Sequence, residues 1–196
     1  MEQRNNPKDM IYMIGGNGVA KEEREPYDYY ATDPKAVDYL LKHETFDHNI
    51  WECACGEGNI SKRLEKYGYN VKSTDLVYRN FGEKESVNFL MQYEKFDGDI
   101  ITNPPFKIAL EFIQKALELS KRKVAMFVKL QFLETQKRYK ELFLKNPPSK
   151  IYIFVKRMKC FKNNEQTTYG SAISFCWIVW DKEYDGEPVI RWIDNT

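Results

Sequence analysis

The sequence lacks several features that would assign a protein to a class at once. No apolar run approaches the ~20 residues of a membrane-spanning helix, and the polar N-terminus has no signal-peptide core. Only two histidines are present, and the four cysteines lack paired CxxC spacing, which argues against a zinc site and for reduced, mostly buried thiols. We therefore expect a cytoplasmic protein without a bound metal, whose 196 residues suffice for one well-packed domain.

A net excess of charge is also nearly absent, because the formal net charge is +1, but the charge is distributed unevenly along the chain. The net charge is −6 for residues 1–106, +11 for residues 107–162 and −4 for residues 163–196. A basic segment of this size favours a polyanionic substrate, because neutralised phosphates supply most of the non-specific affinity for nucleic acids. The alternative is that these cations line solvated helix faces.

The most informative stretch is residues 99–106, DIITNPPF, in which a short apolar run ends in an amide, two prolines and an aromatic ring. Consecutive prolines cannot donate to a sheet, so a buried strand must end at Asn103 and leave in a rigid turn. The Asn103 amide and the Pro104 carbonyl would then be two hydrogen-bond acceptors beside the ring of Phe106. This set suits a planar ring with an amino group. The alternative is a Pro104-Pro105 loop next to a helix-capping asparagine.

A glycine loop lies upstream of this stretch. A predicted strand ends in Gly56 and Gly58 and leads into a helix over 62–67, so a ligand could approach the backbone closely. A dinucleotide-binding loop would have a third glycine where Ser61 stands, which disfavours that alternative. Glu52, four residues before the first glycine, suits a ligand with the cationic amino group of an amino acid.

A second short strand is predicted over 70–75 and ends in Asp75. A carboxylate at the tip of the strand that follows a glycine loop is well placed to bind both hydroxyls of a ribose. The alternative is that Asp75 caps a loop.

Two of these motifs carry a resemblance to a known family. Asn-Pro-Pro-Phe after a hydrophobic strand, residues 103–106, resembles the catalytic motif of amino methyltransferases that use S-adenosylmethionine, above all the DNA adenine-N6 methyltransferases. Glu-x-x-x-Gly-x-Gly, residues 52–58, resembles the first cofactor motif of class I methyltransferases, and its Ala-Cys-Gly-Glu-Gly form is similar to the small phage-type group. The resemblance covers about residues 29–180 and implies four catalytic residues: Asn103, Pro104, Pro105 and Phe106.

The resemblance also implies a set of residues that bind S-adenosylmethionine: Tyr30, Thr32, Glu52, Cys53, Ala54, Gly56, Gly58, Asp75, Asn88, Phe89 and Asn103. Tyr30 and Thr32 belong to a run similar to the Tyr-x-Thr-Pro segment that contacts the methionine end of the cofactor, although Asp33 intervenes here. Asn88 and Phe89 stand where relatives recognise the cofactor adenine with an acidic residue followed by phenylalanine. The amide of Asn88 keeps an acceptor oxygen but lacks the charge.

Substrate contacts are expected from residues that follow the proline turn. Phe106 would stack on the target adenine, and Phe161 or Tyr169, in a polar and basic linker, would cover the far face of that base. Lys107 and Lys129, which lie in the basic segment, are expected to bind the nucleic acid.

The predicted fold is α/β, a doubly wound, Rossmann-like methyltransferase sheet that is mostly parallel with an antiparallel C-terminal strand. Residues 1–26 are expected to form an N-terminal arm, either a flexible tail or a mobile lid, and residues 27–196 a single domain without a separate target-recognition domain. Further elements are predicted as helices over 108–119 and 133–144, as strands over 124–130, 151–155 and 173–180, and as an edge strand or a tail over 189–193.

These expectations predict an enzyme that transfers a methyl group from S-adenosylmethionine to the exocyclic N6 amine of adenine in DNA. The alternatives are methylation of adenine in RNA, methylation of a protein glutamine amide, and a non-catalytic nucleic-acid-binding protein that keeps the fold. The expected partner is DNA, no membrane contact is expected, and either a monomer or a homodimer is compatible with the sequence.

Overall fold

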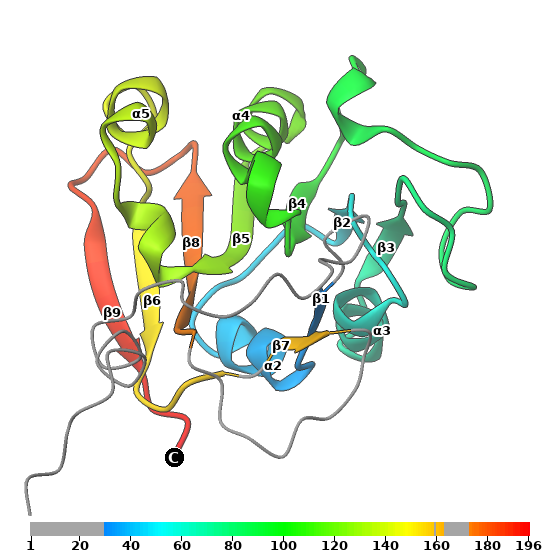
Figure 1. The fold of residues 1–196 in the computed structure, drawn as a ribbon, viewed down its shortest axis with the longest axis horizontal. Helices are drawn as coiled ribbons and strands as arrows, with labels where there is room; N and C mark the ends of the chain where they lie inside the picture. The colour runs from blue at the N-terminus through cyan, green and yellow to red at the C-terminus, as the bar shows by residue number, and fades with distance from the viewer. Residues whose placement is uncertain (1–29, 159, 163–172) are drawn as a thin grey trace, which may run out of the picture.

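The computed structural model describes residues 30–158, 160–162 and 173–196, with only the backbone of residues 161 and 162. It contains a seven-stranded sheet with the strand order β3-β2-β4-β5-β8-β6-β9 and a two-stranded ribbon of β1 and β7 (Figure 1). The predicted N-terminal arm, residues 1–26, lies outside the described residues. Within the part that the structure describes, no helix is both long enough and apolar enough to cross a membrane.

The large sheet confirms the predicted fold class. Four strands pair in parallel: β3 (Asn70–Ser73), β2 (Asn49–Glu52), β4 (Asp99–Thr102) and β5 (Lys123–Lys129). The antiparallel strand is β8 (Phe175–Asp181), which lies between β5 and β6 (Lys150–Phe154). The last strand, β9 (Val189–Ile193), pairs in parallel with β6, so the edge strand and not the tail is correct for this segment.

Helices cover both faces of this sheet, because the central strands are apolar on both sides. In β5, Val124, Met126 and Val128 pack in one core, which includes α4 (Ala109–Leu119). Ala125 and Phe127 alternate with them and pack in the opposite core. That second core includes two helices, α2 (Lys35–Leu41) and α3 (Asn59–Lys66), which lie in the lower part of Figure 1.

Most predicted elements differ from the observed ones by one or two residues, and three differences bear on the site. Helix α3 begins at Asn59 and not at residue 62, and β3 ends at Ser73, two residues before Asp75. The helix predicted over 133–144 is wrong as one element. Instead the chain forms a 3₁₀ turn, a single helical turn α5 and a π-helix: Leu130–Leu133, Gln136–Arg138 and Tyr139–Phe143. The break is at Thr135, whose φ of 97° is incompatible with a right-handed helix.

Because β2, β4 and β5 are parallel, their carboxyl ends meet at one edge of the sheet, the carboxyl edge, and their amino ends meet at the opposite amino edge. The ribbon of β1 (Tyr30–Thr32) and β7 (Cys160–Lys162) lies at the carboxyl edge, where it contacts the residue after β4. Clusters of polar side chains lie at both edges.

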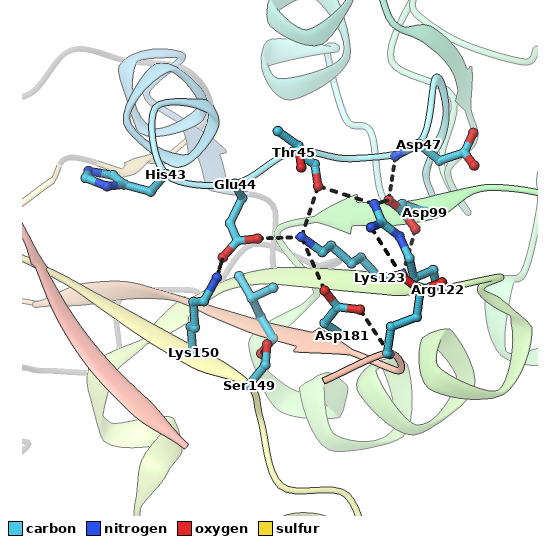
Figure 2. Close-up of polar contacts among 12 residues, drawn as sticks. His43, Glu44, Thr45, Asp47, Asp99, Arg122, Lys123, Ser149, Lys150 and Asp181 are labelled. Atoms are coloured by element: carbon cyan, nitrogen blue, oxygen red, sulfur yellow. Dashed lines mark hydrogen bonds and ion pairs between the residues drawn. The ribbon is translucent and has the colours of Figure 1, made fainter. Parts of the chain in front are cut away.

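The amino-edge cluster is an ion-pair network around Glu44 and Lys123 (Figure 2). The Glu44 carboxylate accepts hydrogen bonds from Lys123 Nζ at 2.6 Å, Lys150 Nζ at 2.7 Å and the Tyr152 hydroxyl at 2.6 Å. Lys123 Nζ also lies 3.4 Å from Asp181 Oδ2. Burial raises the pKa of Glu44, but the hydrogen bonds from Lys123, Lys150 and Tyr152 outweigh burial and hold its pKa below the ordinary value.

Candidate active site

Asn103, directly after β4, has a side-chain amide that is held from one side only. Its Nδ2 donates to the Tyr30 carbonyl at 3.1 Å and to Thr32 Oγ1 at 3.0 Å, and Cys160 Sγ lies at 3.6 Å. A carbonyl only accepts, so these bonds fix which end of the amide is the nitrogen. The opposite atom, Asn103 Oδ1, is buried and has no hydrogen-bond partner among the described residues.

Unpartnered buried polar atoms gather at this point of the fold. The described residues have three buried side-chain atoms without a partner, and two of them, Thr102 Oγ1 and Asn103 Oδ1, are on adjacent residues. Most buried polar atoms in native proteins are hydrogen-bonded, so such an exception needs an explanation. Of these two residues, Asn103 lines the pocket and Thr102 does not, so Asn103 Oδ1 is the acceptor that a ligand at the end of this parallel strand would meet.

Strand β1 joins this turn to the glycine loop. Thr32 accepts from Asn103 with its hydroxyl and from Asn59 Nδ2 with its carbonyl, the latter at 3.2 Å. Asn59 is the first residue of α3, so one residue of β1 fixes the positions of both neighbouring motifs. Sequence reasoning placed Tyr30 and Thr32 near the cofactor, and here both line the same pocket as Asn103.

The ring of Phe106 lies beside the amide and is covered by side chains of the protein itself. Tyr30 stacks on it with ring centroids 5.2 Å apart, and the ring of Phe175 lies at 5.9 Å. Lys129 Nζ lies over the same ring, 4.2 Å from its centroid. A base that stacked on Phe106 would therefore displace Tyr30 or Lys129.

Glu52, the last residue of β2, is buried at the bottom of the glycine loop. Its Oε2 accepts from the backbone N–H of Ser61 at 2.8 Å and from the Ser61 hydroxyl. Burial is the main cause that raises the pKa of Glu52 to about 8. No cation is paired with this carboxyl group among the described residues, although it lines the pocket. A cationic amino group is the ligand that would favour its ionised form.

At the glycine loop, the ring of Phe81 packs closely on the backbone of Gly58. Gly58 has a φ of 82°, and a Cβ at this position would lie 2.4 Å from the ring of Phe81. Gly56 has a φ of 53°, and its N–H donates to Asp75 Oδ2 at 2.8 Å. Gly58 combines a positive φ with no room for a side chain and must be glycine, whereas Gly56 is favoured by its positive φ alone. Neither glycine lines the pocket.

Asp75 connects the loop after β3 to the glycine loop. Its Oδ1 accepts from the Val77 N–H at 3.0 Å and from Arg79 Nη1 at 3.4 Å, while Oδ2 accepts from Gly56. Asp75 therefore caps the loop after β3, which was the alternative that the sequence left open. A carboxylate has about four lone-pair positions, so Asp75 can still accept from a ligand in the pocket that it lines.

Asn88 and Phe89 lie away from this pocket. Asn88 Oδ1 accepts from Leu90 N at 3.1 Å and caps a 3₁₀ turn. Phe89 is 1% exposed and lies edge-on against Trp51, 5.1 Å between centroids. Neither residue lines the pocket, so their role in adenine recognition stays a prediction.

Several further predicted residues, among them Gly56, Gly58 and Lys129, lie outside the lining of this pocket or outside the described residues. Cys53 is buried, and burial raises the pKa of its thiol well above the ordinary value, which makes it inert. Lys107 is exposed in the 3₁₀ turn after the prolines. The backbone of Phe161 pairs with Ala31, but its side chain lies outside the described residues, as does Tyr169.

The pocket has about 530 Å³ of empty space, counted out to the open solvent, and the structure brings nine predicted residues together around it. These are Tyr30, Thr32, Glu52, Ala54, Asp75, Asn103, Pro104, Pro105 and Phe106. Sequence reasoning missed five lining residues, which are Ala31, Cys55, Asn59, Ile60 and Arg79. It also missed Ser61, whose two hydrogen bonds hold Glu52; an unusual serine at the third-glycine position was the available signal.

We also searched the described part of the chain for a metal site and for a reactive thiol near the pocket. No cluster of three or more potential metal ligands occurs there. Cys55 lines the pocket, but burial raises the pKa of its thiol to about 12. Cys53, Cys55 and Cys176 are buried and Cys160 is partly exposed.

Comparison with known proteins adds solved structures but no sequence relative. No protein-family model matches the chain, and no curated protein sequence matches it. A candidate class I S-adenosylmethionine-dependent methyltransferase from Listeria monocytogenes has a TM-score of 0.56 and 13% identity, over 95% of this chain and 71% of that protein.

Two further solved structures are similar. The modification subunit of a candidate type I restriction enzyme from Vibrio vulnificus has a TM-score of 0.54 and 14% identity, over 96% of this chain and 53% of that subunit, so this chain spans about half its length. The 23S rRNA methyltransferase ErmE has a TM-score of 0.52 and 14% identity, over 81% of this chain and 72% of that enzyme. At these identities the comparisons establish the fold, which is the Rossmann-like fold of class I methyltransferases.

Proposed function

We propose that this protein is an S-adenosylmethionine-dependent methyltransferase that acts on the exocyclic N6 amine of adenine in DNA. The observation that carries the proposal is the amide of Asn103, whose nitrogen is held by Tyr30 and Thr32 while its oxygen is buried without a described partner. A buried acceptor without a partner costs about 1–3 kcal/mol. An amine that donates to Oδ1 would recover this cost, which supports an amine as the reacting group.

The Asn103 amide would also activate the amine. An amine on an aromatic ring is a weak nucleophile because its lone pair is delocalised into the ring. A hydrogen bond from the amine to Asn103 Oδ1 favours a nitrogen on which the lone pair is localised and directs that lone pair away from the amide. Because Tyr30 and Thr32 already hold the amide in place, little reorganisation is needed when the amine reacts.

The residues around the glycine loop fit the proposed cofactor. Glu52 would bind the cationic amino group and Asp75 would accept from the ribose hydroxyls, while Gly56 and Gly58 give the loop between them its shape. When bound, S-adenosylmethionine supplies a methyl group on a positively charged sulfur, so that the carbon–sulfur bond breaks as the carbon–nitrogen bond forms, S-adenosylhomocysteine leaves and the amine loses a proton to water.

The assignment to DNA is supported by the resemblance of residues 103–106 to the DNA adenine methyltransferase motif and by the basic character of residues 107–162. One protein with the same fold is, by its name, the modification subunit of a candidate type I restriction enzyme. RNA is the second candidate, because ErmE, an rRNA methyltransferase, also has this fold.

The test is transfer of labelled methyl from S-adenosylmethionine to unmethylated duplex DNA, to RNA of the same sequence and to a glutamine peptide, followed by analysis of the labelled product. We expect label in N6-methyladenine from DNA. Label in RNA or in the peptide alone would change the substrate class. Cofactor binding with no label in any of the three would contradict the proposed reaction.

A further inference from the structure

A second groove adjoins the pocket and shares the ring of Phe106 with it. This groove has about 900 Å³ of empty space, counted out to the open solvent. Besides Phe106, its walls come from the start of α4, the end of β5 and the segment after β5, including Phe132, Thr135 and Arg138. Nothing in the proposed methyl transfer uses these last three residues.

Each of the two aromatic rings in the groove is covered by a cation. Lys129 Nζ lies 4.2 Å from the centroid of Phe106, and the guanidinium carbon of Arg138 lies 4.4 Å from the centroid of Phe132. A cation over an aromatic face contributes about 0.5–2 kcal/mol and keeps the charged group at a defined place. Two cations are therefore positioned along one groove that starts at the proposed target-base ring.

Arg138 is fixed by more than its ring contact. Its Nη1 donates to the carbonyls of Gln131, Phe132 and Glu134, at 3.1, 3.4 and 3.3 Å. A guanidinium has five N–H groups in a planar fork. Its Nε and Nη2 have no hydrogen-bond partner among the described residues, so a preorganised cation lines the groove with donors to spare. Such a fork suits the oxygens of a phosphate.

The backbone beside Arg138 is strained. Thr135 has a φ of 97°, which is rare for a β-branched residue, and its hydroxyl accepts from the Arg138 N–H at 3.4 Å. This conformation starts the short helix that carries Arg138 and interrupts the single helix that the sequence predicts. Strained residues of this kind cluster at ligand sites, because the fold must hold them in place.

The distribution of charge agrees with an anionic ligand here. Of the basic residues between 107 and 162, Lys121, Arg122, Lys123 and Lys150 pair with acidic groups at the amino edge. Lys129 and Arg138 line the groove, together with one acidic residue, Glu134. The cations of this segment are therefore divided between the amino edge and the groove.

We propose that this groove binds the polynucleotide strand next to the target adenine, with the flanking phosphodiester at Arg138 and Lys129. This inference rests on the proposed function. When the target base stacks on Phe106, Lys129 leaves the ring and pairs with the phosphate, while Arg138 stays clamped on Phe132 and offers Nε and Nη2. The ligand is recognised by its phosphodiester, which DNA and RNA share.

The test measures binding of a fluorescein-labelled single-stranded DNA 12-mer with one adenine, and of its RNA counterpart, by fluorescence anisotropy across a salt series. Arg138→Gln should weaken oligonucleotide binding about tenfold and lower the slope of log Kd against log salt by about 1. Arg138→Lys should keep the slope. The matched control is Arg191→Gln, because Arg191 is an exposed arginine on β9, separated from β5 by β8 and β6. It should bind like the unsubstituted protein.

The outcomes separate the two proposals. If Arg138→Gln and Arg191→Gln bind both oligonucleotides equally well while methyl transfer persists, the groove proposal is overturned and the proposed function stands. If the protein neither binds S-adenosylmethionine nor transfers methyl, yet Arg138→Gln weakens oligonucleotide binding, the proposed enzyme activity is overturned. Binding of nucleic acid in the groove is then still supported. Preference for the DNA or the RNA 12-mer identifies the source of the phosphodiester.

A second measurement uses the unsubstituted protein, in case Arg138→Gln unfolds. A 12-mer with 4-thiothymidine next to the adenine is crosslinked by ultraviolet light, and the modified peptide is identified by mass spectrometry. We expect the crosslink within residues 129–138. Crosslinks confined to other parts of the chain would overturn the proposed position of the strand.

Discussion

Two buried glutamates, Glu44 and Glu52, lie at opposite edges of the same sheet and differ in what surrounds them. Glu44 at the amino edge accepts from two lysines and a tyrosine, and its pKa is held below the ordinary value. Glu52 at the carboxyl edge has Ser61 as its hydrogen-bond donor among the described residues, and burial raises its pKa to about 8. The first carboxylate is compensated inside the protein, whereas the second is not.

The difference separates a structural polar cluster from a binding site. A buried charge with all its partners fixes the fold, and the Glu44 network joins the loop before β2 to the starts of β5 and β6. At the carboxyl edge, Glu52 without a cation and Asn103 Oδ1 without a donor lie around one pocket. Buried groups that the protein leaves uncompensated there indicate where a ligand completes the structure.

The largest effect is expected from Asn103→Ala, which removes the acceptor at the carboxyl edge. Loss of one preorganised hydrogen bond to a reacting group costs a factor of about 10²–10³ in rate. We therefore expect methyl transfer to fall about 10³-fold. Cofactor affinity should change only a few-fold, because Glu52 and Asp75 are untouched. Single-turnover kinetics and calorimetry measure the two quantities separately.

The matched control for Asn103→Ala is Asn70→Ala. Asn70 begins β3 at the amino ends of the parallel strands, and its Nδ2 bonds Asn49 Oδ1. This variant should transfer methyl at the unsubstituted rate. Equal rates for Asn103→Ala and the unsubstituted protein would refute the role of the amide.

The next largest effect is expected from Glu44→Gln, which breaks the compensated cluster at the amino edge. Lys123 would keep its buried charge with one fewer counter-ion, and removal of one partner of a buried ion pair costs about 3–5 kcal/mol. Denaturant unfolding at pH 7 should show a free energy of unfolding lower by about 3 kcal/mol. Glu118→Gln, which removes an exposed ion pair with Lys115, should cost less than about 1 kcal/mol.

The difference in the free energy of unfolding between Glu44→Gln and the unsubstituted protein should depend on pH in a predictable direction. The folded-state pKa of Glu44 is depressed below 4.5, so its stabilising contribution is present above pH 4.5 and is lost as pH falls through the folded value. The gap between Glu44→Gln and the unsubstituted protein should therefore narrow under acid. A gap that widened would mean that Glu44 is not the compensated group.

The carboxyl edge was predictable from the sequence because its residues follow a local rule. Glu52, Asp75 and Asn103 each stand at or just after the end of a strand, and parallel strands bring such positions together. The fold class followed from the resemblance of these motifs to class I methyltransferases. The position of Arg79 did not, because it depends on how the loop after β3 returns to the pocket.

The amino edge was not predictable for a related reason. Lys123 and Glu44 are 79 residues apart, so the sequence showed only a basic segment and no partner for it. Several lysines that suggested a nucleic-acid surface are ion-paired there instead. The serine at the third-glycine position marked Ser61, but its hydrogen bonds to Glu52 become visible only with the start of α3 at Asn59.

Glu52→Gln tests the uncompensated carboxyl group and should have an intermediate effect. Loss of the negative charge should weaken S-adenosylmethionine binding about tenfold, or ~1.4 kcal/mol. Calorimetry of the unsubstituted protein at pH 7 should also detect proton release on binding, because a bound cation lowers the raised pKa of Glu52. Buffers with different ionisation enthalpies measure this release. Binding without proton release would mean that no cation reaches Glu52.

The contribution of Glu52 to stability should depend on pH in the opposite direction to that of Glu44. Between pH 4.5 and about 8 the folded protein retains a proton on Glu52 that the unfolded chain releases. The contribution of Glu52 to stability is therefore full below pH 4.5 and is lost as pH rises through about 8. Glu52→Gln should be less sensitive than the unsubstituted protein to a rise in pH from 6 to 9, as thermal unfolding can measure.

The smallest effect is expected from Asp75→Asn, because Asp75 is partly compensated within the carboxyl edge. Its Oδ2 bonds the Gly56 N–H and its Oδ1 bonds the Val77 N–H, so an amide nitrogen in place of either oxygen loses one hydrogen bond, worth about 1 kcal/mol. Cofactor affinity should fall about fivefold, or ~1 kcal/mol, since the glycine loop shifts and one ribose acceptor is lost. Methyl transfer at saturating cofactor should stay within a few-fold of the unsubstituted rate. A loss of transfer as large as that of Asn103→Ala would place Asp75 with the reacting groups and not with the loop that holds the cofactor.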